Sequence, residues 1–375
     1  MDSAVSRAEL KGSAGRIPEP LPDGLGLRGL LRRAGQLAAF AVLTGLLITT
    51  LPGLSDVRDR FSDARPGWLA PLVVLELASC LAFVAVFRGV FCTRLTWRFC
   101  YQIALASQAT NVLLPAGGVG GLALGAWVLR QGGMSGARIA RRSVAFFIIT
   151  SIPNFAGAAV FGLLLGFGVL AGSGPHALTF VMAGLATATI AVVLLIPRIV
   201  SRFAVSDRLE SLDARGIARA RQVLHRGAVA ASAGVEDVAL LLRTRQPGVV
   251  SGAVGYMAFD VAALAAAFAA LGTVPPLAAF VFAYVLGQLG GLIPVPGGIG
   301  GTDGGLIAAL TLYGSPLAQS TAAVLAYRSM QLGIPAILGS VAFIQLRRTL
   351  ARGGAPAALC DPLPGPLPVV TLPAR

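Results

Sequence analysis

Charged residues are scarce in this sequence, where only 12% of 375 residues are Asp, Glu, Lys or Arg. A soluble domain carries about 25%, and a hydrophobic content of 55% excludes an intrinsically disordered chain. Four cysteines in a chain of this length exclude a disulfide scaffold. The 47 glycines lack a three-residue period, which excludes a collagen-like chain. The class that remains is a polytopic membrane protein.

Six continuous apolar runs and two interrupted ones predict an all-α polytopic membrane protein, with about six transmembrane helices plus two re-entrant helical hairpins. Hydrocarbon about 30 Å thick needs about 20 helical residues. The interrupted regions, 95–131 and 277–312, contain clusters of proline and glycine, and their second arms would each reach only about 20 Å. The continuous runs are 34–51, 67–92, 143–170, 176–197, 248–271 and 317–345.

The net charge of +14 is a topology signal in such a chain, and no nucleic-acid partner is expected. Arginines flank both ends of the region 95–131, whereas the immediate flanks of the region 277–312 carry no charge. Because short cytoplasmic loops collect Arg and Lys, the first region is expected to enter from the cytoplasm and the second from outside. Both termini are then cytoplasmic, and the membrane is expected to be the cytoplasmic (inner) membrane of a bacterium.

The expected organisation is a transmembrane domain over residues 34–346 between two flexible cytoplasmic ends, 1–33 and the Pro-rich tail 347–375. The one sizeable polar segment is 198–246, in which apolar residues recur at spacings of three and four from Ile217 to Leu242. This spacing predicts an amphipathic helix or helical pair. It lies either along the membrane surface or against the bundle as a packing helix, and both options stay open.

The two interrupted regions resemble each other when one is moved along the sequence by the difference in number between Gln108 and Gln288. We call this difference the repeat offset. The segment QATNVLLPAGGVGG, 108–121, aligns without a gap with the segment QLGGLIPVPGGIGG, 288–301. Since the two regions are expected to enter from opposite sides, they predict an inverted-topology repeat. Repeat 1 covers about 67–171 and repeat 2 about 248–345.

The apices of the two hairpins are candidate binding residues, because irregular backbone in a bilayer requires protein or water as partner. The helix that starts after each glycine cluster would point its N-terminal N–H groups at the site, which favours an anion such as a phosphate. The alternative is that the glycines only allow close helix packing. The candidates are Gln108, Asn111, Gly117, Gly118, Gly120, Gln288, Gly297, Gly298 and Gly300.

Four ionisable residues in or beside the spans are further candidates, since a charge in hydrocarbon costs a few kcal/mol (~2.5–3.5 on insertion scales). Arg328 is the expected anion partner, or else a structural partner of Asp260 or Glu76. Asp303 would contribute to substrate binding or cap the half-helix. Glu76 or Asp260 could accept a proton and couple transport to a proton gradient.

The catalytic and metal-binding motifs of soluble enzymes are nearly absent from this sequence. His176 and His225 are expected on opposite sides of the membrane, so no metal site and no cofactor are predicted. Cys80, Cys92, Cys100 and Cys360 lack a Cys-x-x-Cys spacing and are expected to be mostly small buried side chains. No Gly-Lys-Ser/Thr phosphate loop occurs.

The segments LLPAGGVGG and GQLGGLIPVPGGIGGTDGGL are similar to two signature regions of the lysylphosphatidylglycerol synthase transmembrane-domain family, a flippase-like group. The resemblance covers about residues 35–346. It departs from the family at Gly121, Leu122 and Leu124, where many members carry an acid and an arginine. A Pro-Gly-Gly-x-Gly-x-x-acid pattern common in the family is matched by Pro296, Gly297, Gly298, Gly300 and Asp303.

The resemblance implies lipid handling, with membrane lipids as partners and an anionic phospholipid or polyprenyl-phosphate lipid as substrate. The soluble aminoacyl-transferase domain of the full-length synthases is expected to be lacking, so catalysis is not the leading hypothesis. The leading function is a lipid flippase or transporter that binds an anionic headgroup between the opposed hairpins. The alternative is a membrane enzyme or accessory protein acting on lipid-linked sugars or phospholipids, for which the acids available outside are Asp56, Asp59 and Asp63. The sequence does not define the oligomeric state.

Overall fold

The computed structural model describes residues 35, 55–113, 119–131, 134–172, 174–206, 231–244, 246–292 and 298–352, and within these ranges it contains no strand. The predicted all-helical class is thereby confirmed. The expected first span, 34–51, and the expected ends of the chain lie outside the described residues, apart from a few positions. The helices are α3 (Ser55–Ser62), η2 (Pro66–Trp68), α4 (Leu69–Phe91), α5 (Trp97–Leu113), α6 (Val119–Gln131), α7 (Gly136–Gly166), α8 (His176–Ser206), α10 (Pro247–Leu271), α11 (Leu277–Gln288), η3 (Leu289–Leu292), α12 (Gly301–Leu312) and α13 (Leu317–Ala351).

Among the described residues, five helices are long and apolar enough to cross a membrane. These are α4, extended by η2 to Pro66–Phe91, and α7, α8, α10 and α13. Three of them exceed the apolar runs that predicted them: α7 begins at Gly136 rather than 143, α8 continues to Ser206 rather than 197, and α13 continues to Ala351 rather than 345. The added turns carry arginines, which extend each helix out of the apolar layer.

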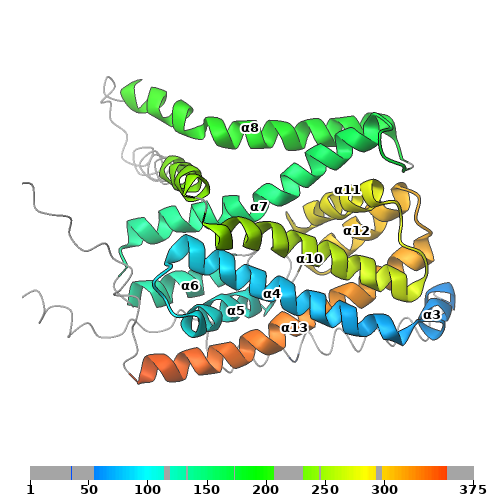
Figure 1. Ribbon diagram of the computed structural model, residues 1–375, viewed down its shortest axis with the longest axis horizontal. Helices are drawn as coiled ribbons and strands as arrows, with labels where there is room; N and C mark the ends of the chain where they lie inside the picture. Colours follow the sequence, from blue (N-terminus) through cyan, green and yellow to red (C-terminus); the bar gives the residue numbers. More distant parts are fainter. Residues whose placement is uncertain are drawn as a thin grey trace, which may run out of the picture.

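The bounds of the helices recur at the repeat offset. Adding this offset to the residue numbers of α5 gives 277–293, and α11 and η3 together cover 277 to 292. Adding it to the residue numbers of α7 gives 316–346, and α13 covers 317–351. In Figure 1 the two copies lie apart, with α5 and α6 at the left end of the bundle and α11 and α12 at the right end. The helical pattern thus follows the repeat that the sequence predicts.

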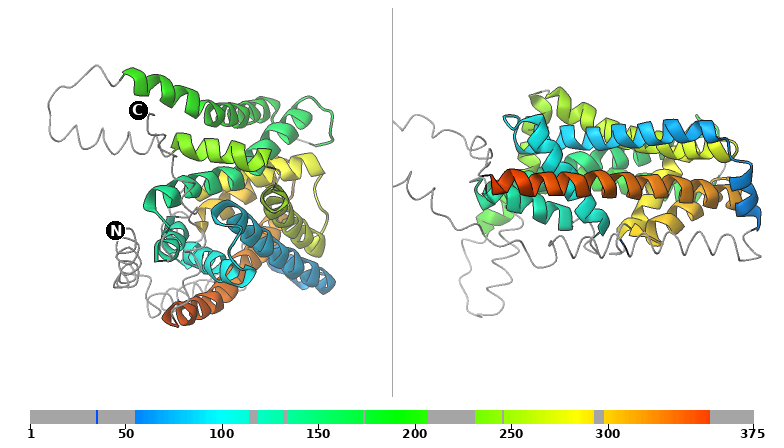
Figure 2. Two further views of the ribbon diagram at one scale, coloured as in Figure 1. Left: turned by 60° about the vertical axis from the view of Figure 1, so that its left-hand side comes forward. Right: turned by 90° about the horizontal axis from the view of Figure 1, so that it is seen from below.

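Each interrupted pair of helices lies in a hydrophobic core of its own. The first core surrounds α5 and α6 and includes Phe87 of α4, Phe146 of α7 and Phe343 of α13. The second surrounds α11 and α12 and includes Phe268 of α10 and Tyr327 of α13. Helix α13 therefore contributes to both cores, and Figure 2 (right) shows it running along the whole bundle. This long helix therefore packs against both interrupted helix pairs.

Close helix contacts depend on small residues. A Cβ on Gly339 of α13 would clash with the carbonyl oxygen of Leu105 in α5. A Cβ on Gly252 of α10 would lie 3.0 Å from the carbonyl oxygen of Ala82 in α4. Glycine at these positions lets two backbones approach, as small residues do at many membrane helix interfaces. Helices α4 and α10 pack along each other, and so do α5 and α13.

The described part of the polar segment is a helix over residues 231–243 that packs against the start of α7. Val238 and Leu241 are buried in the first core. Asp237 lies 2.8 Å from Nε of Arg141 and 3.4 Å from Nε of Arg142. This part therefore behaves as the packing helix that the sequence left as one of two options, while residues 207–230 lie outside the described residues.

Candidate functional site

A buried ion pair lies at the start of α12. The side chain of Arg328, on α13, is buried, and its Nε lies 2.5 Å from Oδ1 of Asp303. Sequence reasoning selected both residues, with Arg328 as an anion partner or, alternatively, as a structural partner of Asp260 or Glu76. The direct partner is instead Asp303, because the hairpin brings the N-terminus of α12 against the middle of α13.

Asp303 also caps α12. The backbone N–H of Gly300 donates to Oδ2 of Asp303 over 2.9 Å. Gly298 and Gly300 have φ angles of +66° and +84°, a region that side chains disfavour, and they turn the chain into the helix. One carboxylate therefore bridges a helix N-terminus and an arginine. The capping role is thus one that the sequence offered for Asp303, and the ion pair with Arg328 is an addition to it.

A chain of hydrogen bonds extends this pair into the bundle. Nη1 of Arg328 donates to Oε1 of Gln331, and Nε2 of Gln331 donates to both carboxylate oxygens of Asp260 at 3.1 and 3.0 Å. The hydroxyl of Tyr284 also donates to Asp260. Asp260 is thus connected to Arg328 through Gln331 rather than directly. This arrangement leaves Asp260 well supplied with donors although it is buried.

Gln331 and Tyr284 were missed by sequence reasoning, which considered ionisable residues and the glycine clusters. The available signal was their position. Gln331 lies three residues after Arg328, which places both on one face of a helix. Tyr284 lies on the first arm of the second hairpin, where a hydroxyl among apolar residues requires a partner.

Glu76 is the most isolated of the predicted acids. It lies on α4, is 3% exposed, and its Oε2 atom has no hydrogen-bond partner within the described residues. Its charged neighbours are Asp260 and Arg328. The structure therefore gathers Glu76, Asp260, Asp303 and Arg328 around one region of the bundle.

The polar residues of the first hairpin make more local contacts. Oδ1 of Asn111 accepts a hydrogen bond of 2.6 Å from the backbone N–H of Gly121, so Asn111 ties the two arms together. The buried side chain of Gln108 contacts the hydroxyl of Tyr256 on α10. Gly120 lies in the first turn of α6, and Gln288 ends α11 half-buried. Gly117, Gly118 and Gly297 lie outside the described residues.

The ionic network belongs to one repeat only. Under the repeat offset, Asp303, Arg328 and Gln331 correspond to Ala123, Ile148 and Ser151. Asp260 and Tyr284 correspond to Cys80 and Ala104. The two hairpins share a backbone plan, but only the second provides an arginine and two carboxylates. This is consistent with the departure of the first region from the family pattern.

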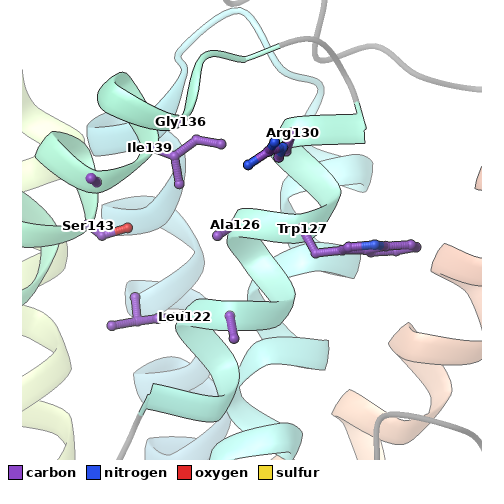
Figure 3. Close-up of a pocket in the computed structure, with 9 residues that line it drawn as sticks. Leu122, Ala126, Trp127, Arg130, Gly136, Ile139 and Ser143 are labelled. Carbon is purple, nitrogen blue, oxygen red and sulfur yellow. The ribbon is translucent and has the colours of Figure 1, made fainter. Parts of the chain in front are cut away.

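Two apolar grooves line the second arms of the hairpins. One, of about 470 Å³, lies between α6 and α7, and Figure 3 shows Ala126 and Arg130 of α6 facing Ser143 and Ile139 of α7, with Leu122 at the other end from Arg130. The other, of about 630 Å³, follows one face of α12 from Gly304 to Leu312 and reaches Leu317. The second groove therefore starts at the residue after Asp303.

Metal-binding clusters are absent from the part of the chain that the structure describes, where no group of three His, Cys, Asp or Glu side chains converges. Cys80 and Cys100 are buried free thiols, as the sequence indicated. Asp56, Asp59 and Asp63 are exposed on and just after α3. Cys360 and His225 lie outside the described residues.

Long apolar helices, an internal repeat of interrupted helices and a buried ionic site define a multi-pass membrane protein. The chain belongs to the lysylphosphatidylglycerol synthase TM region family, whose model matches residues 36–339. This membership relates it to lipid handling. The comparison with curated proteins gave no match.

Proposed function

We propose that the protein is a lipid transporter of the flippase type that binds an anionic headgroup at Arg328 and the N-terminus of α12. The observation that carries this proposal is the carboxylate of Asp303, which bridges the Gly300 N–H and the Arg328 guanidinium. A lipid phosphate has the oxygens to make the same two contacts. Asp303 then acts as the internal anion that a substrate headgroup displaces.

The groove along α12 supports a lipid rather than a free phosphate. It is lined by Ile307, Ala308 and Leu312, and it begins beside Asp303. An acyl or prenyl chain could lie along it while the headgroup contacts Arg328. Apolar walls with a few convergent polar groups at one end are typical of sites for amphiphilic ligands.

The proposed location is the cytoplasmic membrane of a bacterium, with both termini in the cytoplasm. This rests on the arginines that flank the first hairpin and end α13, among them Arg138, Arg347 and Arg348. The two interrupted pairs would then be re-entrant hairpins entering from opposite sides. An anionic phospholipid or a polyprenyl-phosphate lipid is the proposed substrate.

Reconstitution into liposomes with a labelled phosphatidylglycerol, and separately with a labelled polyprenyl phosphate, tests the proposal. The intact chain is expected to accelerate transbilayer movement of at least one probe. Arg328→Gln is expected to lower that rate at least about tenfold, since a hydrogen bond to a charged group contributes about 1.5–3 kcal/mol. Arg348→Gln is the matched control, because Arg348 is exposed at the end of the same helix.

No acceleration of either probe by folded wild-type protein would refute the transport proposal. Equal rates for Arg328→Gln and Arg348→Gln would refute the assignment of the site. Asp303→Asn adds a second measurement, because it removes the competing carboxylate charge. It is expected to raise the affinity for the probe while it lowers stability.

A further inference from the structure

The interface between α4 and α10 contains two pairs of ionisable side chains that correspond under the internal repeat; Glu76, Cys80 and Asp260 are buried and Tyr256 is half-buried. At the repeat offset Glu76 corresponds to Tyr256, and Cys80 corresponds to Asp260. The two helices pack along each other, as Figure 1 shows. The four positions therefore gather where the two repeats meet, and Glu76 and Asp260 are the charged neighbours of both Cys80 and Tyr256.

The charges of this region do not balance if every acid is ionised. Glu76, Asp260 and Asp303 would carry three negative charges against the single positive charge of Arg328. Asp303 contacts Arg328 directly, and Asp260 receives hydrogen bonds from Gln331 and Tyr284. Glu76 has an Oε2 atom without a partner in the described structure, although its side chain is buried. An ionised carboxylate with a buried, unpartnered oxygen is costly, and a carboxylic acid is much less so.

We propose that Glu76 binds and releases one proton inside the membrane, and that its charge state is coupled to the Arg328–Asp303 pair. In the step itself the O–H bond of the Glu76 carboxylic acid breaks, the bonding electrons stay on the carboxylate, and the proton leaves to water. A metal cation would require several oxygen ligands, whereas the described residues offer no group of three ligating side chains.

The residues around Glu76 are consistent with one carboxyl group that gains and loses a proton. Cys80 lies on its own helix, Tyr256 and Asp260 face it from α10, and Arg328 faces it from α13. The ionisable residues of α5 and α7 lie in the first turns of those helices, which Figure 1 places at the opposite end from the start of α4. These residues of α5 are Arg98, Cys100 and Tyr101, and those of α7 are Arg138, Arg141 and Arg142.

A small cavity reaches Tyr256, one of the neighbours of Glu76. A cavity of about 160 Å³ is lined by Tyr256 of α10, by Ser107 and Asn111 of α5, and by phenylalanines of α4. Gln108, which contacts Tyr256, has a buried Oε1 atom without a partner in the described structure. Tyr256 therefore stands between the cavity and the acids of the interface, in a position to pass a proton.

Coupling follows from the position of Arg328 between the acids. The positive charge of Arg328 stabilises the ionised form of Glu76. An added anion that binds Arg328 neutralises part of this charge, so anion binding favours proton uptake by Glu76. Proton loss from Glu76 in turn favours release of the anion, because linkage is reciprocal. This coupling deepens and rests on the proposed transport function, but the proton site itself requires no lipid substrate.

Infrared difference spectroscopy of the full chain in phosphatidylcholine nanodiscs, titrated from acidic to alkaline pH, tests the proposal. The wild type is expected to show a protonated-carboxyl band that disappears with rising pH, and Glu76→Gln is expected to lack it. Arg328→Gln is expected to move the transition toward higher pH, because removal of a nearby positive charge favours the neutral acid. Asp237→Asn, a buried acid outside this region, is the matched control and should leave the band unchanged.

A band that persists at every pH would overturn the proposal, because Glu76 would then be a permanently protonated structural residue. A transition that is unchanged in Glu76→Gln would overturn it as well. If Glu76→Gln does not fold, Glu76→Asp retains a carboxyl and should shift the band. None of these measurements uses a lipid probe, so their failure is distinguishable from failure of the transport assay.

Discussion

At the scale of single residues, the site depends on one carboxylate that makes two different contacts. Asp303 closes the N-terminus of α12 through Gly300 and neutralises Arg328. A residue with either contact alone would be a cap or an ion-pair partner. Asp303 makes both contacts, and under the proposed function a substrate anion would compete with it for the same groups.

Gly298 provides a test of the turn that positions this carboxylate. Its φ angle is +66°, and a Cβ at this position would lie 2.5 Å from Oγ1 of Thr302. Gly298→Ala is therefore expected to destabilise the protein by about 1–2 kcal/mol or more, because the left-handed conformation disfavours a side chain. The measurement is the apparent melting temperature of the purified protein in detergent, which should fall.

Gly304→Ala is the matched control for that substitution. Gly304 lies in the helix that follows the turn, and a Cβ there would meet nothing within 4 Å. Alanine inside a helix is more favourable than glycine by about 1 kcal/mol, so the melting temperature should stay the same or rise. A Gly298→Ala variant as stable as Gly304→Ala would contradict the described turn.

At the scale of secondary-structure elements, hydropathy predicted the long helices well but not their ends. The apolar runs at 248–271 and 176–197 correspond to α10 and to the first part of α8. Helices α7, α8 and α13 extend beyond their runs, because the hydrogen bonds of a helix continue through arginines that hydropathy counts as loop. Boundaries drawn from hydrophobicity mark the apolar layer rather than the helix.

The crossing of α13 over α5 provides a test of packing between elements. A Cβ on Gly339 would clash with the Leu105 carbonyl oxygen and lie 2.5 Å from the Ala109 Cβ. Gly339→Ala should separate two packed backbones and cost about 1–3 kcal/mol, as overpacking does. The measurement is again the apparent melting temperature in detergent.

Gly333→Ala is the comparison on the same helix, since a Cβ at Gly333 would have nothing within 4 Å. It is expected to leave the melting temperature unchanged or to raise it. If both alanine variants behaved alike, α5 and α13 would not approach as closely as described.

At the scale of the whole molecule, the two repeats place the two hairpins at opposite ends of one bundle. The start of α3 and the end of α13 lie at these opposite ends, as Figure 1 shows. Only the second repeat carries the ionic network, while both carry an apolar groove along the second arm. The two repeats therefore share a plan of helices, and the side chains of the ionic network lie in one of them.

Single cysteines test the orientation of this frame in the membrane. In a background without the native cysteines, Asp59→Cys is expected to react with an impermeant maleimide in intact cells. Arg348→Cys is expected to react only after permeabilisation, because arginine-rich ends remain in the cytoplasm. Both positions are exposed, so accessibility does not limit the comparison. Labelling of both from outside would contradict the proposed topology.

Sequence alone determined the membrane class, the long helices, the repeat offset and the candidates Arg328 and Asp303, because these follow from local composition and periodicity. Tertiary structure alone decided which partners meet. It paired Arg328 with Asp303 instead of Asp260, inserted Gln331 between Arg328 and Asp260, and left an oxygen of Glu76 without a hydrogen-bond partner among the described residues. These contacts join residues far apart along the chain, and their geometry depends on how the two repeats pack, which no local pattern encodes.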